Sequence, residues 1–591
     1  MSNHRRVPRY HHSPIDSYCQ VYAVLAENNA PVRACFNLLL VIGVGLLAGC
    51  GRSEQPKPLQ PSIPPAARSA AVFRAHFTGT TRLSADTNAA PWISIGQLPS
   101  FQALRRQTLE KLSQAPHDWA QHRIATTNDF AGAFQELIAD LIRAESFVEV
   151  AGDSNRTVEV ALALRLPTDR AEYWQTNLLA ILEAWTGCRG ERLPADPMGW
   201  QLRKHHEPDL FRLVRSGNWT LVGWGQDQLH LQDEYRMRIK QTGSPGATTS
   251  NAWLEVFLDF PNLAAVWRSA FTGSGVADTP GGGILSARSW PAVELLLNPY
   301  ADNLQLKGSF VFRDAFSFRP EVWQIPTNFI HEPIISFTAI QGVAPIVESF
   351  LDSLGVHSLS PPNQLFVWAG GNFPVQTLAA APMPHAEEYV RNLAPPMIER
   401  FNPALQAMNA GFLSLTSNAP GVQTIRWAGI PPWVTPYISS ATDSGVDFLM
   451  AGTYPDWVGT NPPPVLFHNL LGRTNLVYYD WEVTAAHVQS WRAVINVIRH
   501  FFEKPRLRPE SPSIVFLDSV SNRLGNVITE ITRSDSNRLA LVRQGPVGLT
   551  GLELIALAHW LESTNFPLNG LALAAWTNAP PARSRQSQDT E

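Results

Sequence analysis

The sequence is poor in charged residues. Asp, Glu, Lys and Arg make up 16% of the 591 residues, where a typical soluble domain has about a quarter. The formal net charge is −4, and basic residues form no cluster of the kind that nucleic-acid-binding proteins carry. We therefore expect large buried surfaces and no nucleic-acid partner.

Sequence motifs of the common enzyme classes are also missing. The chain has no G-x-S-x-G nucleophile elbow, no P-loop and no H-E-x-x-H zinc helix. We therefore assign no catalytic, cofactor-binding or metal-ligating residue and expect no cofactor. Whether the protein is an enzyme stays open, and the missing motifs favour a non-enzyme.

A few polar clusters are candidates for sites. His205 and His206 are adjacent, so on a strand they would point to opposite faces, and a turn is the better interpretation. His385, followed by Glu387 and Glu388, stands where a helix is expected to begin, a place where acidic residues act as caps.

Two aspartates end apolar segments that precede helical patterns. Asp259 follows LEVFL, and Asp480 follows LVYY in the second half of the chain. Paired carboxylates can serve hydrolysis, but the end of a strand before a helix is a natural capping position. We interpret both residues as helix caps.

Cysteine is scarce, with four residues in the chain. Cys19 and Cys35 precede an apolar run at residues 38–48, and Cys50 follows this run two residues later. Cys188 is the one cysteine in the rest of the sequence. If residues 1–49 are removed and the Cys50 thiol is modified, Cys188 is the one free cysteine left and no intrachain disulfide can form. Cys188 is then expected to be a small buried hydrophobic residue.

The apolar run itself, Leu38 to Ala48, has 11 residues, which as a helix spans about 16 Å and is too short to cross a membrane. Arg33 precedes it, and Leu47-Ala48-Gly49-Cys50 closes it. This segment resembles the lipobox of bacterial lipoprotein signal peptides. The resemblance implies cleavage between Gly49 and Cys50 and lipid on the Cys50 thiol.

The resemblance also implies an address. Gly51, rather than Asp, follows the cysteine, which favours a lipid-anchored protein of the cell envelope, in the outer membrane rather than the inner one. Residues 1–49 are then the signal peptide, and residues 50–71 are the lipidated cysteine and a Pro-rich tether. Residues 577–591 are expected to be a disordered tail.

Between tether and tail, helical and strand patterns alternate. Apolar residues from Phe134 to Ile142 recur at helical spacing, those from Val158 to Leu166 alternate as in a strand, and those from Trp174 to Trp185 again follow a helix. Residues 200–224 contain short strand patterns separated by glycines, which predicts an antiparallel meander.

This order of patterns recurs along the chain. SFVEVAG, with Phe147, is echoed by LFVWAGG, with Phe366. The other echoes keep nearly the same separation along the chain and the same order. We predict an α+β fold of two tandem copies, residues 72–329 and 330–576, each a mostly antiparallel sheet with helices packed on one face.

Three functions remain open at this stage. The first is a non-catalytic, lipid-anchored envelope protein that binds a protein or glycan partner or scaffolds an assembly. The second is an envelope hydrolase acting on glycan or peptide, with its site in a groove between the two copies. The third is a carbohydrate-binding surface protein, which needs exposed aromatic residues; Trp427 and Trp433 are candidates.

Overall fold

The structure is a computed structural model, and most of the chain between residues 71 and 567 is described. The described residues are 71–120, 130–152, 158–193, 198–203, 209–226, 229–246, 252–260, 262, 291–316, 318, 320–357, 359–371, 376–407, 409–419, 422–429, 435–454, 464–501, 508–563 and 566–567. Gly49 and Cys50, the tether, the tail, His205, His206 and Trp433 lie outside these ranges.

The first half of the described chain contains ten strands and six α-helices. The strands are β1 (Ala71–Phe77), β2 (Ser146–Gly152), β3 (Val158–Arg165), β4 (Glu191–Arg192), β5 (Gly199–Arg203), β6 (Asp209–Ser216), β7 (Trp219–Gln226), β8 (Leu254–Asp259), β9 (Ala292–Tyr300) and β10 (Asn303–Val311). The helices are α3 (Thr80–Ser84), α4 (Ala90–Gly96), α5 (Pro99–Ala120), α6 (Ala131–Arg143), α7 (Thr168–Thr186) and α8 (His230–Thr242). The two helices, the strand and the meander predicted from residues 134 to 224 correspond to α6, β3, α7 and β5–β7.

The second half of the described chain adds ten strands and six α-helices. The strands are β11 (Ile334–Gln341), β12 (Gln364–Gly370), β13 (Thr377–Pro382), β14 (Phe412–Ala419), β15 (Val422–Ala428), β16 (Tyr437–Asp443), β17 (Val446–Gly452), β18 (Leu476–Val483), β19 (Asn526–Arg533) and β20 (Arg538–Gly545). The helices are α10 (Ala344–Ser353), α11 (Ala386–Ala407), α12 (Pro464–His468), α13 (Thr484–Phe501), α14 (Pro512–Val520) and α15 (Gly551–Glu562).

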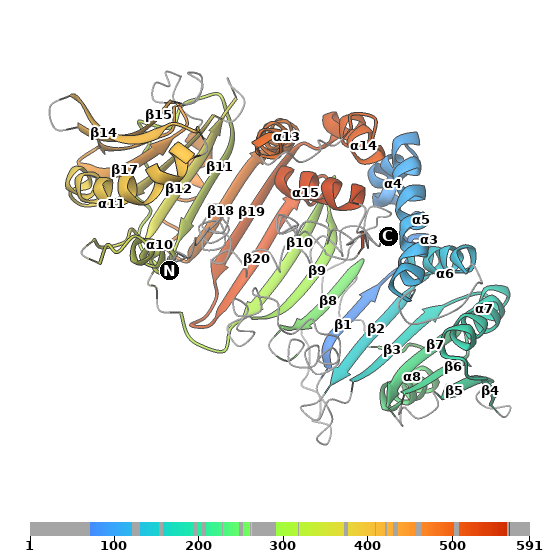
Figure 1. Cartoon of the computed structure of the whole chain (residues 1–591). Helices are drawn as coiled ribbons and strands as arrows, with labels where there is room; N and C mark the ends of the chain where they lie inside the picture. Colours follow the sequence, from blue (N-terminus) through green and yellow to red (C-terminus); the bar gives the residue numbers. More distant parts are fainter. Residues whose placement is uncertain are drawn as a thin grey trace, which may run out of the picture.

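All 20 strands belong to one antiparallel sheet. Following the hydrogen-bonded neighbours, its order is β4-β5-β6-β7-β3-β2-β1-β8-β9-β10-β20-β19-β18-β11-β12-β13-β17-β16-β15-β14. In Figure 1 the sheet runs as a broad band from β14 and β15 to β4. The predicted α+β class with mostly antiparallel pairing is confirmed.

The pairing order of the first ten strands returns in the last ten, read from the opposite edge. Both β1 and β11 carry a register shift at their start, between Ala71 and Phe73 and between Ile334 and Ser336. Counting along the ladders from these two shifts, Phe147 of β2 and Phe366 of β12 occupy the same place. The predicted echo between these two phenylalanines therefore agrees with the strand registers.

The two halves meet edge to edge. Eight consecutive residue pairs join β10 to β20, from Leu304 with Gly545 to Val311 with Arg538. The predicted boundary at residues 329 and 330 falls between β10 and β11, where the chain passes from one half of the sheet to the other. A continuous ladder, rather than a groove, thus lies at the junction.

Helices cover both faces of the outer part of the sheet. Leu164 of β3 packs in one core cluster with Trp174 of α7, whereas its neighbour Ala163 packs in another with Tyr235 of α8. Because adjacent residues of a strand point to opposite faces, α7 and α8 lie on opposite sides. The prediction of helices on one face alone is wrong for this part of the sheet.

The centre of the sheet has its largest apolar core under several helices. This cluster joins β8, β9, β10 and β20 to helices from both halves of the chain (Figure 1). These are α4 and α5 from the first half and α13, α14 and α15 from the second half. The helix α15 begins with a capping box in which Thr550 and Glu553 satisfy each other's backbone N–H groups. None of the helices in the described part of the chain is long and apolar enough to cross a membrane.

Both edges of the sheet are protected from further pairing. The strand β4 has two residues, both charged and exposed, whereas β14 has eight residues without a charge. At Leu413 of β14, however, the side-chain amide of Asn402 accepts from the backbone N–H at 2.6 Å and donates to the carbonyl at 3.0 Å. An amide of α11 thus occupies the place of a neighbouring strand.

Candidate functional site

The candidate site is a polar cavity at the start of α11. The strand β13 ends at Pro382, and the chain reaches α11 through Met383, Pro384 and His385. His385 has a left-handed backbone, with φ of 58°, which is uncommon for a residue other than glycine. Its carbonyl accepts the first helical hydrogen bond, from the N–H of Tyr389, at 3.1 Å.

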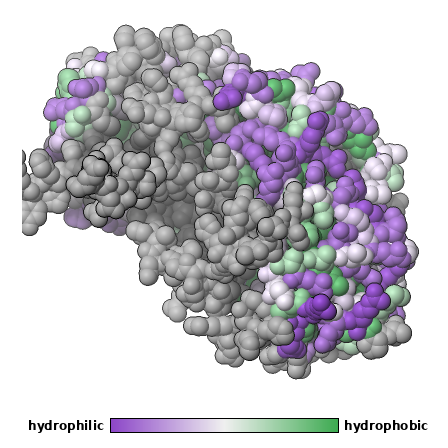
Figure 2. All heavy atoms as spheres, turned by 45° about the vertical axis from the view of Figure 1, so that its right-hand side comes forward, coloured by the Kyte–Doolittle hydropathy of each residue, from purple (hydrophilic) through white to green (hydrophobic). Residues whose placement is uncertain are grey.

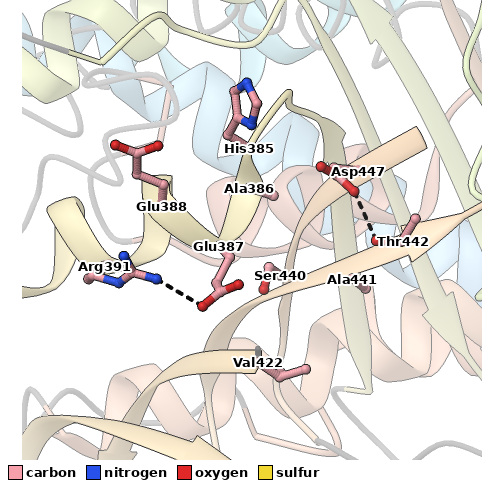
Figure 3. A pocket seen from close by; sticks show the side chains of 10 residues that line it. All are labelled: His385, Ala386, Glu387, Glu388, Arg391, Val422, Ser440, Ala441, Thr442 and Asp447. Carbon is pink, nitrogen blue, oxygen red and sulfur yellow. Dashed lines mark hydrogen bonds and ion pairs between the residues drawn. The ribbon is translucent and has the colours of Figure 1, made fainter. Parts of the chain in front are cut away.

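The cavity has a volume of about 430 Å³ (Figure 3). It lies between the first turns of α11 and strands β16 and β17, and it is lined by His385, Ala386, Glu387, Glu388, Arg391, Val422, Ser440, Ala441, Thr442 and Asp447. Three carboxylates thus face one guanidinium and one imidazole. The volume suits a small polar molecule or a single side chain of a partner.

Two of the carboxylates are already engaged. Arg391 donates to Glu387 at 2.9 Å across one helical turn, and the hydroxyl of Thr442 donates to Asp447 at 2.9 Å (Figure 3). Glu388 has no cationic partner among the described residues. The cavity therefore carries net negative charge and favours a ligand with an ammonium or guanidinium group and hydroxyl or amide donors.

Groups that could do chemistry in the cavity are not assembled as a catalytic pair. Neither the hydroxyl of Ser440 nor a carboxylate is hydrogen-bonded to His385 within the described part of the chain. A nucleophile needs an adjacent, oriented base, and the described residues of the cavity form no such pair. Among the described residues, no group of three His, Cys, Asp or Glu side chains is placed to hold a metal ion.

A second polar group was not found from the sequence: a charged cluster buried under α13 and α15, which we call the buried cluster. Its charged members are Asp480 and Glu482 of β18, His487 of α13, Arg543 of β20 and Glu553 of α15. The exposed fractions of the three carboxylate residues are 6%, 1% and 5%. Asp480 and Glu482 are two positions apart, so they share the face of the sheet that the helices cover.

Hydrogen bonds hold each member of the buried cluster. Arg543 donates to both carboxylate oxygens of Glu553, at 2.9 and 2.7 Å. Glu482 accepts from the backbone N–H of Gly551 at 2.7 Å and is hydrogen-bonded to Nδ1 of His487. The one side-chain donor to Asp480 among the described residues is the hydroxyl of Thr338, at 2.6 Å.

Burial raises the pKa of the Asp480 carboxyl to about 6, and the neighbouring Glu482 adds to this effect. The hydrogen bond from Thr338 and the charges of Arg543 and His487 act in the opposite direction without cancelling it.

Asp480 is not the helix cap that we predicted, because it lies inside β18 rather than at its end. Asp259 does act as a cap: its carboxylate accepts from the backbone N–H of Asn262 at 3.2 Å.

The strand registers also correct the predicted correspondence of the two aspartates. Counting from the register shifts in β1 and β11, Asp480 stands opposite Thr338 as Val256 stands opposite Ala75. The residue of β8 that occupies the place of Asp480 is thus Val256, not Asp259. The sequence does show the Thr550-x-x-Glu553 capping box, which predicts the start of α15 but not the contact of Glu553 with Arg543 of β20.

A third polar group surrounds Glu145, just before β2. Oε1 of this carboxylate lies 2.9 Å from Arg82 and 3.4 Å from His76, and Oε2 lies 3.2 Å from Arg165. Burial alone would raise the pKa of Glu145, but the hydrogen bonds from His76, Arg82 and Arg165 and the charge of Arg82 lower it to about 2. The side chains of both arginines are more than half exposed, which is typical of a structural ion-pair group.

The remaining predicted residues are placed simply. Cys188 is buried and unpaired, so the prediction of a small buried hydrophobic residue is confirmed. Trp427 is half-buried, and its indole N–H donates to the carbonyl of Ala410 at 2.6 Å. None of the tryptophans whose exposure is described is fully exposed.

One side of the molecule is visible in Figure 2. Its described surface is mainly hydrophilic, with apolar residues scattered between the polar ones. Single apolar residues of this kind are normal on a protein surface, so they do not mark a docking patch on the described part of that side.

Comparison with known proteins gives little. No protein family model matches the chain, and no curated protein matches it. One solved structure, entitled "Structure of crystal form III of TP0453", superimposes with a TM-score of 0.20 and 10% identity, over 50% of this chain and 88% of that chain. A superposition this weak supports no inference about fold or function.

Proposed function

We propose that the protein is a lipid-anchored protein of the cell envelope that binds a partner and does no chemistry on it. The anchor is the lipid on Cys50 that the lipobox resemblance implies, with the outer membrane favoured by Gly51. The observation that carries the binding role is the cavity at the start of α11. Two of its three carboxylates are held by neighbouring side chains, and none of its described groups forms a nucleophile–base pair.

The ligand of this cavity is expected to carry positive charge. Glu388 is unpaired among the described residues, and three carboxylates face one arginine. A lysine or arginine side chain of an envelope protein, or an amino group on a glycan or peptide, meets that requirement. With a volume of about 430 Å³, the cavity has room for an anchoring group of a larger partner.

The proposal includes an origin for the fold: the two halves of the sheet are tandem copies of one ten-strand unit. The repeated pairing order and the matching register shifts in β1 and β11 support this interpretation. The separation between Phe147 and Phe366 fits it, whereas the separation between β1 and β11 is larger because α3 to α6 lengthen the first half. A duplicated plate that carries the cavity at the start of α11 in its second half suits a scaffold with a specific contact there.

The anchor is tested by fractionating cells that express the protein or its Cys50→Ser variant. We expect the unaltered chain in the membrane fraction and in the detergent phase of a phase separation. The Cys50→Ser variant is expected in neither. Equal, fully soluble behaviour of both chains in the cytosol would contradict the anchor.

The binding role is tested by crosslinking in intact envelopes and identifying the captured partner by mass spectrometry. Glu388→Lys reverses the unpaired charge of the cavity, and we expect it to reduce the amount of crosslinked partner at least tenfold. Glu399→Lys is the matched control, since Glu399 is exposed on the same helix and does not line the cavity. Equal capture by all three chains would exclude the cavity, and turnover of the captured partner would favour the hydrolase alternative.

A further inference from the structure

The buried cluster contains three carboxylates but one guanidinium and one imidazole, and it lies between the sheet and the helices α13 and α15. Arg543 is paired with Glu553, and His487 is paired with Glu482. These contacts use the guanidinium and the imidazole of the cluster and leave Asp480 without a hydrogen bond to either of them. Its only described side-chain donor, the Thr338 hydroxyl, is neutral.

The groups that face Asp480 come from every element packed around it. They are Tyr478 and Glu482 on β18 itself, Thr338 on β11, Thr529 on β19, Arg543 on β20, His487 on α13 and Glu553 on α15. The described hydrogen bonds of Arg543 go to Thr529, at 2.9 Å, and to Glu553, and none of them goes to Asp480. An ionised Asp480 is therefore a buried carboxylate whose charge is poorly balanced.

The first half of the sheet shows that this fold does not require charge at these positions. By register, Val256 and Leu258 of β8 occupy the places of Asp480 and Glu482. Both are almost fully buried, and Val256 belongs to the apolar core at the centre of the sheet. An apolar side chain would fill the place of Asp480 at lower electrostatic cost.

We propose that Asp480 is the sensor of a pH-sensitive latch, which fastens α13 and α15 to the sheet when the carboxyl takes up a proton. Among the described residues, Asp480 is hydrogen-bonded to Thr338 of β11 and to neither helix. Its link to the helices is its neighbour Glu482, which lies on the same face of β18. His487 of α13 binds Glu482, and the backbone N–H of Gly551, at the start of α15, donates to the same carboxylate. The two helices also pack against each other.

The direction of the response follows from the pKa of Asp480. The folded carboxyl binds a proton at about pH 6, well above the value of about 4 for an unfolded aspartate. As the pH falls through 6, the folded protein takes up a proton before an unfolded chain does, and the closed arrangement becomes more stable. Above pH 6 the ionised carboxylate loosens the cover formed by α13 and α15.

The test is hydrogen exchange of the full-length lipidated chain in detergent, read by mass spectrometry at pH 7.5 and pH 5.0. Rates are corrected for the intrinsic effect of pH on exchange. We expect the protection factors of the α13 and α15 amides to rise at least tenfold at the lower pH, with those of α7 and α11 unchanged. Equal protection of α13 and α15 at both pH values would overturn the proposal.

Substitutions identify the sensor. Asp480→Asn and Asp480→Val, the second copied from Val256, should give high protection at both pH values. Glu348→Gln, an exposed acid on α10, is the control and should keep the full response. A response that survives in both Asp480 variants, or that disappears in His487→Gln while Asp480 is intact, would assign the sensor elsewhere and overturn the proposal.

Discussion

Glu145 and Asp480 are two buried carboxylates in one sheet with opposite acidities. Their exposed fractions are 8% and 6%, yet the pKa of Glu145 is lowered to about 2 and that of Asp480 is raised to about 6. Three cationic or potentially cationic side chains surround Glu145, whereas Asp480 has one hydroxyl donor. Two side chains of similarly low surface exposure thus become a stable ion and a proton-binding group, because Asp480 is enclosed more deeply by protein and has fewer cations in reach.

The largest effect is expected from removing the cation of the buried cluster. Arg543→Met leaves Glu553 buried without a cationic partner and takes away the charge that restrains the pKa of Asp480. We expect the free energy of unfolding to fall by about 3–5 kcal/mol, measured by urea denaturation at pH 7. Lys307→Met, an exposed residue of the adjoining β10, is the control; equal losses would mean that the cluster is not a buried ion-pair network.

A smaller loss is expected from neutralising Glu145. Glu145→Gln deprives Arg82, Arg165 and His76 of their common carboxylate. Since both arginines are half-exposed and regain water, we expect a loss of about 1–3 kcal/mol in the same experiment. Glu136→Gln, a carboxylate half-exposed beside Arg170, should lose much less, and a loss equal to that of Glu145→Gln would remove the distinction between matched and exposed ion pairs.

The pH dependence of stability separates the two carboxylates. Between about pH 6 and pH 4, protonation of Asp480 should raise the free energy of unfolding by about 1–2 kcal/mol. Below about pH 4.5, protonation of the unfolded chain at Glu145 should lower it, progressively toward pH 2. Asp480→Asn should abolish the first change and keep the second, and a titration curve without the rise in the parent chain would refute the contrast.

The smallest effect concerns the cavity. Arg391→Ala breaks the ion pair with Glu387, whose two side chains are 55% and 37% exposed. We expect a change of about 0.3–0.5 kcal/mol in stability, measured by the same denaturation, together with tighter binding of a cationic partner. A loss above about 2 kcal/mol would show that the pair is structural rather than part of a binding surface.

Local structure could be predicted where the apolar pattern had a clear period. The alternation from Val158 to Leu166 predicted β3, and the helical spacing from Phe134 to Ile142 predicted α6. These patterns depend on residues a few positions apart. The continuous sheet depends instead on the ladder between β10 and β20, whose partners are far apart along the chain, and no local pattern fixes that register.

The candidate site could be predicted only in part. His385, Glu387 and Glu388 stood out as a polar group at a helix start, but the cavity also needs Thr442 and Asp447, which reach it through the strand registers. Asp480 was misjudged because an acid after an apolar segment has the same sequence pattern at a strand end as inside a strand. Only the packing of α13 and α15 decides between the two.

The position of β1 in the sheet has a consequence for how the protein would stand on a membrane. Six strands lie on one side of β1 and thirteen on the other, and neighbouring strands are about 4.8 Å apart. A tether that joins the sheet at Ala71 would therefore be attached well away from both edge strands, roughly 30 Å from β4 and roughly 60 Å from β14. The larger part of the sheet, which ends at α11 and β14, would move over a wide range of positions as the tether bends. The cavity would move with it.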